Sequence, residues 1–311
     1  MLITRPQMGV VLILSLGMLS ATDRKATPAE SGARFRVDSR VVLVPVSVTD
    51  QADRPVLGLD TPHFRVYERG VEQQVLQISR EDAPMAVGLV FDTSLSMMPK
   101  MAAARAAAAA LLDTANPEDE FFLIEFDDTP RVTQHLTSDP GEIQMRLTQA
   151  TPHGHTALLD AVYLGVQELR KSSKPRKALV ILSDGGDNHS RYTARELGGL
   201  LRESDVAVYA MGLFAATPAI LAEEERDGPG LLEQMTRQTG GRFVAVPDPR
   251  GLPEAAGSIG AELHNRYVIA FAPSGDDSDG KYRKLQVKVV PPEGLRALRV
   301  AWRPGYYAPA P

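Results

Sequence analysis

Two kinds of hydrophobic pattern divide the chain. Over Phe35–Val48 and again over His63–Glu81, apolar and β-branched residues alternate with polar positions and turn residues, which is typical of β-strands. From Met85 onward short apolar runs alternate with longer helical segments, and strand-like runs return after residue 264. This order predicts an α/β region between two β-rich ends.

The central region carries the clearest signal for a parallel sheet. Strands that alternate with helices favour a doubly wound, mainly parallel arrangement. The Ala-rich helical stretch combines high helix propensity with small side chains, which favours close packing against a sheet. The expected strands cover 85–91, 120–126, 177–184 and 206–214, and the expected helices between them cover 100–114, 156–171 and 193–203.

The β-rich ends predict a second, smaller domain. We expect the N-terminal β segment, 35–83, to pair with the C-terminal β segment, 264–311, in a small β-sandwich-like domain. The α/β domain, 84–263, would then be inserted in this domain or flanked by it.

Residues 1–21 have the pattern of an export signal. Arg5 precedes an apolar run over Met8–Leu19, and a polar stretch that we interpret as a linker, 22–34, follows. The run has the length of a signal-peptide core, about 7 to 15 residues, and is shorter than the roughly 20 of a membrane span. We expect an exported protein, periplasmic or extracellular, with an uncleaved membrane anchor as the alternative.

Composition narrows the class of partner. The chain is 43% hydrophobic and 23% charged, which is typical of a globular protein. Its 311 residues are enough for more than one domain. The net charge of -5 without a long basic run argues against a nucleic-acid partner. The chain has no cysteine, which excludes disulfides, thiol catalysis and lipid attachment at a cysteine.

The candidate chemistry begins where the first central strand ends. The stretch "DTSLSM" places Asp92, Ser94 and Ser96 at alternate positions. In an extended segment such residues project to one side, so their oxygens can converge on one point. Oxygen ligands without sulfur or imidazole suit Mg²⁺ or Mn²⁺ better than zinc. A polar turn with helix-capping serines is the alternative reading.

Two further oxygen-bearing residues are expected at the same edge of the sheet. Thr156 precedes a predicted helix in "PHGHTALLDA", and Asp184 ends a predicted strand in "ALVILSDGGDN". Ligands of open α/β sheets collect outside the carboxyl ends of the strands, so both residues can join the first three. Each also has a local alternative, a helix cap for Thr156 and a turn at Asp184. The candidate metal ligands are Asp92, Ser94, Ser96, Thr156 and Asp184.

The motifs "DTSLSM", "GHTALLDA" and "LVILSDGGDN" resemble the metal-ion-dependent adhesion site of the von Willebrand factor A domain, which has a Rossmann-like fold. From about residue 40 to 307 the chain is similar to an exported bacterial family called VWFA-related domain proteins. The resemblance implies that Ser94, Ser96 and Thr156 contact Mg²⁺ or Mn²⁺ through hydroxyl oxygens. It also implies that Asp92 and Asp184 bind the ion directly or through water.

The same resemblance implies an adhesion module, not an enzyme. Its partner would be a protein that presents an Asp or Glu to the ion, and association with the cell envelope would follow from export. The alternatives are a structural envelope module with a non-functional metal site and a Mg²⁺-dependent hydrolase. Against a hydrolase, Ser94 stands where a haloacid-dehalogenase-like phosphatase needs a second Asp, and the nucleophile-elbow, Walker and HExxH motifs are absent.

The sequence departs from the family pattern at two positions. Leu95 and His155 stand where the family commonly has glycine. Leu95 would make a positive φ at its position costly. We interpret His155 as a partly exposed loop residue that, with His153, offers too few ligands for a zinc site.

Overall fold

The computed structural model describes the chain from residue 41 onward, apart from residues 82, 215–222, 276–278, 295–296 and 311. The expected signal segment, the linker and the start of the first β segment lie outside the described residues. Within the described ranges, no helix is both long enough and apolar enough to cross a membrane.

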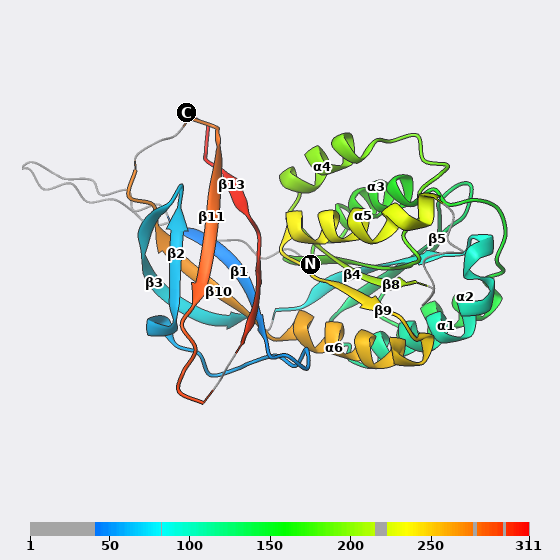
Figure 1. Ribbon diagram of the computed structural model, residues 1–311, viewed down its shortest axis with the longest axis horizontal. Coiled ribbons are helices and arrows are strands. Elements are labelled where there is room, and N and C mark those ends of the chain that lie inside the picture. Colours follow the sequence, from blue (N-terminus) through cyan, green and yellow to red (C-terminus); the bar gives the residue numbers. More distant parts are fainter. Residues whose placement is uncertain (1–40, 82, 215–222, 276–278, 295–296, 311) are drawn as a thin grey trace, which may run out of the picture. The chain divides into compact units, whose positions relative to one another are not determined.

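A six-stranded sheet forms the centre of the α/β part (Figure 1). Its strand order is β6-β5-β4-β7-β8-β9, and every neighbouring pair is parallel except β5 with β6. The prediction of a mainly parallel sheet is therefore confirmed. The strands are β4 (Met85–Asp92), β5 (Glu120–Phe126), β6 (Arg131–Thr137), β7 (Arg176–Ser183), β8 (Val206–Leu213) and β9 (Phe243–Val246).

Helices cover both faces of this sheet (Figure 1). Val87 and Leu89 of β4 join the apolar cluster under α1, α2 and α6, whereas Ala86 and Val90 join the cluster under α3, α4 and α5. Successive strand residues point to opposite faces, so a strand covered on both sides must be apolar along its covered length, as β4 is from Met85 to Phe91. The helices are α1 (Met101–Leu112), α2 (Pro140–Gln149), α3 (Leu158–Leu169), α4 (Ala194–Glu203), α5 (Glu223–Thr239) and α6 (Leu252–His264).

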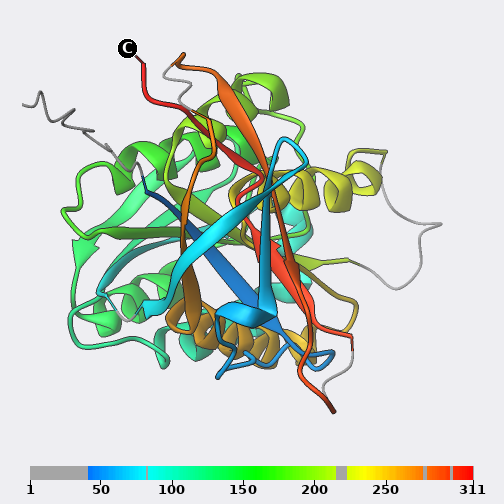
Figure 2. The same ribbon diagram turned by 90° about the vertical axis from the view of Figure 1, so that its left-hand side faces the viewer.

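A seven-stranded antiparallel sheet combines strands from both ends of the described chain, in the order β12-β1-β10-β3-β2-β11-β13. Figure 2 shows blue and cyan strands from the first part interleaved with orange and red strands from the last part. Val44 of β1, for example, lies opposite Ile269 of β10. The strands are β1 (Val42–Thr49), β2 (Phe64–Glu68), β3 (Val71–Glu81), β10 (Arg266–Ala272), β11 (Tyr282–Val289), β12 (Arg299–Trp302) and β13 (Gly305–Tyr307).

This antiparallel sheet curls on itself. The indole Nε1 of Trp302 in β12 donates to the carbonyl of Leu285 in β11 at 3.2 Å, and the Leu285 amide donates to the carbonyl of Pro304 at 2.7 Å. Val46, Phe64 and Ile269 belong to the core that the curl encloses. Where a sandwich-like arrangement was expected, the described strands form one curled sheet, because strand twist brings the two ends of the sheet together.

Three short 3₁₀ segments complete the described elements, and one of them carries part of the candidate site. The segment η2 connects β4 to α1 and contains Ser96. The three are η1 (Thr61–His63), η2 (Leu95–Lys100) and η4 (Pro249–Gly251).

Candidate metal centre

Two candidate ligands leave the parallel sheet from neighbouring strands. β4 ends at Asp92, and β7 ends at Ser183, directly before Asp184. The two strands pair in parallel, with Phe91 opposite Leu182. Both carboxylates therefore emerge at the same carboxyl edge, where ligands of open α/β sheets bind.

The Asp92 carboxylate is fully buried and is held on both of its oxygens. Oδ1 accepts a hydrogen bond from the Ser94 amide at 2.8 Å, and Oδ2 accepts one from the Ser183 hydroxyl at 2.5 Å. Burial, together with the nearby Asp184 carboxylate, raises the pKa of Asp92 from 3.8 to about 7, against the opposing effect of these hydrogen bonds. A cation beside the buried Asp92 carboxylate would favour its charged form.

The Lys100 ammonium supplies a positive charge at this place. Its Nζ donates to Asp184 Oδ2 at 2.9 Å, and the two side chains are 16% and 3% exposed. The other oxygen, Asp184 Oδ1, is buried and has no hydrogen-bond partner among the described residues. A buried polar atom without a partner costs about 1–3 kcal/mol, so the surroundings of Asp184 favour a second cationic contact.

The candidate hydroxyls lie in the loops around these carboxylates. Ser94 Oγ and Ser96 Oγ are 3.0 Å apart, with Ser94 buried and Ser96 partly exposed. Thr156 is buried in the adjoining loop, where its amide donates to Asn188 Oδ1 at 3.0 Å and its carbonyl accepts from the Asn188 amide at 3.0 Å. These contacts link Asp92 to Ser94 and Ser96, and they tie Thr156 to the loop that follows Asp184.

Leu95 is accommodated without a left-handed backbone. Among the described residues other than glycine, a positive φ occurs only at Asp53, Arg69 and Ala297. The expected cost at Leu95 therefore does not arise, because the loop continues directly into η2. The Leu95 side chain is 54% exposed and that of Met98 is 58% exposed, so two apolar side chains stand beside the hydroxyls.

The two loop histidines have different carboxylate partners. Nε2 of His153 lies 3.0 Å from Asp127 Oδ2, and Nδ1 of His155 lies 2.7 Å from Asp128 Oδ1. His155 also stacks on His189, with ring centroids 5.3 Å apart. Both loop histidines are exposed. Sequence reasoning missed Asp128 and His189, because no local spacing relates either residue to His155.

The residues at this sheet edge fit a hard divalent cation. Carboxylate and hydroxyl oxygens are the ligands that Mg²⁺ and Mn²⁺ prefer. Asp184 Oδ1 has no partner in the described part of the chain, and Asp184 Oδ2 accepts from an ammonium, so both oxygens indicate a place that favours positive charge. Asp92, Ser94, Ser96, Thr156 and Asp184 are the residues that would hold such an ion.

Comparison with known families finds a match to the first half of the α/β part. Residues 87–186 match the family model of the von Willebrand factor type A domain. The chain contains a von Willebrand factor type A domain. The matched span includes all five candidate ligands of this type A domain. No curated protein matches the chain.

Solved structures with a similar fold are distant in sequence. A von Willebrand factor type A protein from Catenulispora acidiphila is 12% identical, with a TM-score of 0.51, over 89% of this chain and 75% of that protein. Proximal thread matrix protein 1 from the mussel byssus is 17% identical, with a TM-score of 0.50, over 63% of this chain and 49% of that protein. An aerotolerance-related membrane protein from Bacteroides fragilis is 18% identical, with a TM-score of 0.47, over 58% of this chain and 98% of that protein. Likeness at these identities shows the fold alone.

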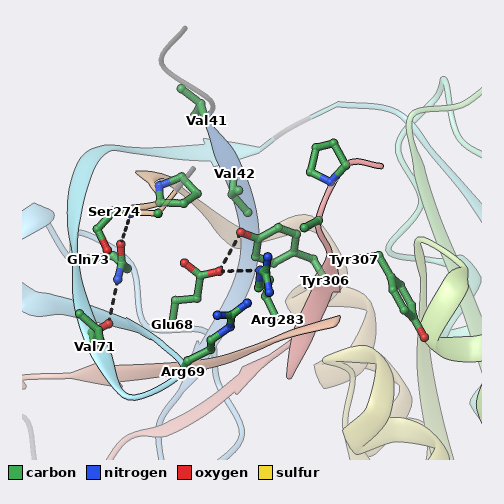
Figure 3. Close-up of a pocket in the computed structure, with 14 residues that line it drawn as sticks. Val41, Val42, Glu68, Arg69, Val71, Gln73, Ser274, Arg283, Tyr306 and Tyr307 are labelled. Carbon is green, nitrogen blue, oxygen red and sulfur yellow. Dashed lines mark hydrogen bonds and ion pairs between the residues drawn. The ribbon is translucent and has the colours of Figure 1, made fainter. Parts of the chain in front are cut away.

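A cavity of about 560 Å³ lies outside the type A domain, in the curled sheet (Figure 3). On its wall, Glu68 Oε1 accepts from the Tyr306 hydroxyl at 3.1 Å and lies 3.8 Å from Nε of Arg283, whose side chain is 4% exposed. Burial and the neighbouring Glu68 carboxylate raise the pKa of Tyr306. These polar groups contact one another across β2, β11 and β13, so we assign them to the stability of the sheet.

Proposed function

We propose that the type A domain holds Mg²⁺ or Mn²⁺ through Asp92, Ser94, Ser96, Thr156 and Asp184, and that it binds a protein partner through this ion. When bound, the ion would supply a Lewis-acidic position that prefers an anionic oxygen. Three neutral hydroxyls and two carboxylates leave that position open to an Asp or Glu of the partner. Type A domains are generally protein-interaction modules, which supports this role.

One observation carries the proposal. The Asp184 carboxylate is buried, one of its oxygens is paired with the Lys100 ammonium, and the other has no partner among the described residues. Asp92, the second buried carboxylate, leaves the adjacent strand. A site of this kind favours a cation, and the hydroxyls of Ser94 and Ser96 supply further oxygens beside it.

The surface around the site suits a protein partner. Leu95 and Met98 are large, apolar and exposed, and both lie in η2 with Ser96. The buried core of a protein interface is more apolar than its rim, so these side chains suit the core of such an interface. A nucleic-acid partner is not part of the proposal, since the net charge is -5.

The proposal also includes the domain organisation of the chain and its location in the cell. We propose a doubly wound type A domain over 84–263, inserted between the β segments 35–83 and 264–311. Supporting this division, β3 ends at Glu81 before β4 begins at Met85, and α6 ends at His264 before β10 begins at Arg266. Export to the periplasm or the extracellular space, with residues 1–21 as a cleaved signal or an anchor, belongs to the same proposal.

Calorimetry on metal-stripped protein tests the metal site. Mg²⁺ should bind the wild type, and Asp184→Ala should weaken binding about tenfold or more, because it removes both a ligand oxygen and a compensating charge. Thr156→Ala should weaken binding less, since it removes one neutral oxygen. Asp113→Ala, a change at an exposed aspartate after α1, is the matched control and should leave the affinity unchanged.

A capture experiment tests the partner. Immobilised protein should retain an envelope protein in Mg²⁺, release it in chelator, and fail to retain it when Asp184→Ala is used. A wild type that binds no Mg²⁺ would favour the structural module with a non-functional site. Phosphatase activity that requires Mg²⁺ would favour the hydrolase.

A further inference from the structure

A second group of metal-ligating side chains lies beside the first candidate site. That first site, of Asp92, Ser94, Ser96, Thr156 and Asp184, is called the hydroxyl-lined site below. Asp128 follows β5, His155 precedes α3 and His189 follows β7, so three separate loops contribute. One ligand atom from each residue lies within 4.8 Å of the other two. His155 Nδ1 is 2.7 Å from Asp128 Oδ1, and the His155 and His189 rings stack at an interplanar angle of 14°.

The backbone holds these three residues together. The His155 amide donates to Asp128 Oδ1 at 2.8 Å, and the His189 amide donates to the carbonyl of Thr156 at 3.1 Å. Gly154 has a φ of +69°, and a Cβ there would lie 2.6 Å from Asp128 Oδ2. Only glycine admits both this backbone conformation and the close carboxylate. The approach of the three loops therefore does not depend on a bound ligand.

The chemistry of this group differs from that of the hydroxyl-lined site. It combines two imidazole rings with one carboxylate, whereas the hydroxyl-lined site offers only oxygen donors. Two imidazoles and one carboxylate are donors that Zn²⁺ and neighbouring transition ions accept readily. Three protein ligands also leave a fourth tetrahedral position open.

Binding requires only local movement. A zinc ion bound at about 2.0–2.1 Å has to lie near the plane of each ring, so the stacked imidazoles must turn about their Cβ–Cγ bonds. The His155 side chain is 67% exposed and His189 is also exposed, so solvent surrounds both rings. Rotation of the His155 ring replaces its hydrogen bond with Asp128 by a bond to the ion, which Asp128 then binds as well.

We propose that Asp128, His155 and His189 form a second metal site, for a transition ion such as Zn²⁺, on the rim of the type A domain. Its residues are distinct from the five that would hold Mg²⁺, so the proposals for the two sites can be tested independently of each other. The open position faces solvent and fits an imidazole or carboxylate of a partner. With both sites loaded, the same sheet edge would present a hard and a softer ion to one partner.

Zinc titration in the presence of saturating Mg²⁺ tests the site, using the full chain and isothermal calorimetry with ZnCl₂ as the probe. We expect one zinc ion per chain. His155→Ala and His189→Ala should each weaken zinc binding about tenfold or more. His153→Ala changes another exposed histidine of the same loop, one that contacts Asp127 instead, and should stay within about twofold of the wild type.

One further variant separates this site from the hydroxyl-lined one. Asp184→Asn should keep the zinc affinity of the wild type. Zinc binding that is lost in Asp184→Asn and retained in His155→Ala would place the ion at the hydroxyl-lined site and overturn the proposal. Equal zinc affinity of the wild type, His155→Ala and His189→Ala would also overturn it. If an alanine variant does not fold by circular dichroism, His155→Asn and His189→Asn replace the alanine changes, with the same expected loss.

Discussion

The ammonium of Lys100 donates to Oδ2 of Asp184 at 2.9 Å, beside the hydroxyls that would hold a divalent cation. Lys100 closes η2, four positions after Ser96, and Asp184 follows β7, so the contact joins two of the loops that carry candidate ligands. The lysine therefore compensates the same carboxylate that a metal ion would use. Metal binding at Asp184 has to displace this ammonium or share the carboxylate with it.

Replacement of Lys100 should have opposite effects on metal affinity and on metal-free stability. We expect Lys100→Met to tighten Mg²⁺ binding about fivefold, corresponding to about 1 kcal/mol of competing ion pair. Without metal, the same change should lower the free energy of unfolding by about 1–3 kcal/mol, because it leaves a buried carboxylate oxygen without its hydrogen-bond donor. Calorimetry and urea denaturation with and without Mg²⁺ measure both effects. Lys100→Arg keeps the positive charge and is the control; equal behaviour of all three proteins would contradict the competition.

The exposed apolar residues of η2 should act on the partner and not on the metal. Leu95→Ala combined with Met98→Ala should weaken partner capture by about 1–2 kcal/mol, because apolar contact area at an interface centre is lost. The Mg²⁺ affinity should be unchanged, since both side chains point to solvent and carry no ligand oxygen. Surface plasmon resonance with the captured partner provides the measurement. A metal affinity that falls together with partner binding would show that the double change distorts the loop.

Two glycines offer a matched test of packing. A Cβ at Gly88 in β4 would lie 2.2 Å from Cζ of Phe122 and 2.7 Å from a methyl carbon of Leu179, so Gly88→Ala should destabilise the fold by about 1–3 kcal/mol. A Cβ at Gly199 in α4 would meet no atom within 4 Å. Gly199→Ala should stabilise the fold by about 0.5–1 kcal/mol through helix propensity. Urea denaturation compares the two, and equal effects would mean that close packing at β4 does not limit stability.

Tyr209 should make stability fall at alkaline pH. Burial, followed by the nearby Glu262 carboxylate, raises the pKa of Tyr209 from 10.0 to about 12. Between these two pH values the folded state binds more protons than the unfolded chain, so the free energy of unfolding decreases as pH rises. The expected loss is about 3 kcal/mol over this range. Tyr209→Phe should remove this part of the pH dependence, which chemical denaturation at pH 9 to 12 measures; an unchanged slope would contradict the assignment.

The central strands illustrate what a local pattern can predict. The apolar runs expected at 85–91, 120–126, 177–184 and 206–214 correspond to β4, β5, β7 and β8. Strands covered on both faces require uninterrupted apolar residues, and this requirement is visible in sequence. The polar edge strand β6 and the short helix α2 were not predicted. β6 is partly exposed along its length, so it carries no such requirement and no such signal.

Residue spacing sets which side chains project from the end of a strand, so the sequence predicts candidate oxygen donors where two central strands end. Asp92, Ser94, Ser96 and Asp184 were predicted in this way, whereas Thr156 was predicted from its place in a loop before a helix. The contact of Lys100 with Asp184, and the grouping of Asp128 and His189 with His155, are visible in the folded chain and not in the sequence. These contacts depend on β4 lying between β5 and β7, which places the loops that follow the three strands side by side. Strand order follows from the packing of the whole chain, and local spacing does not encode it.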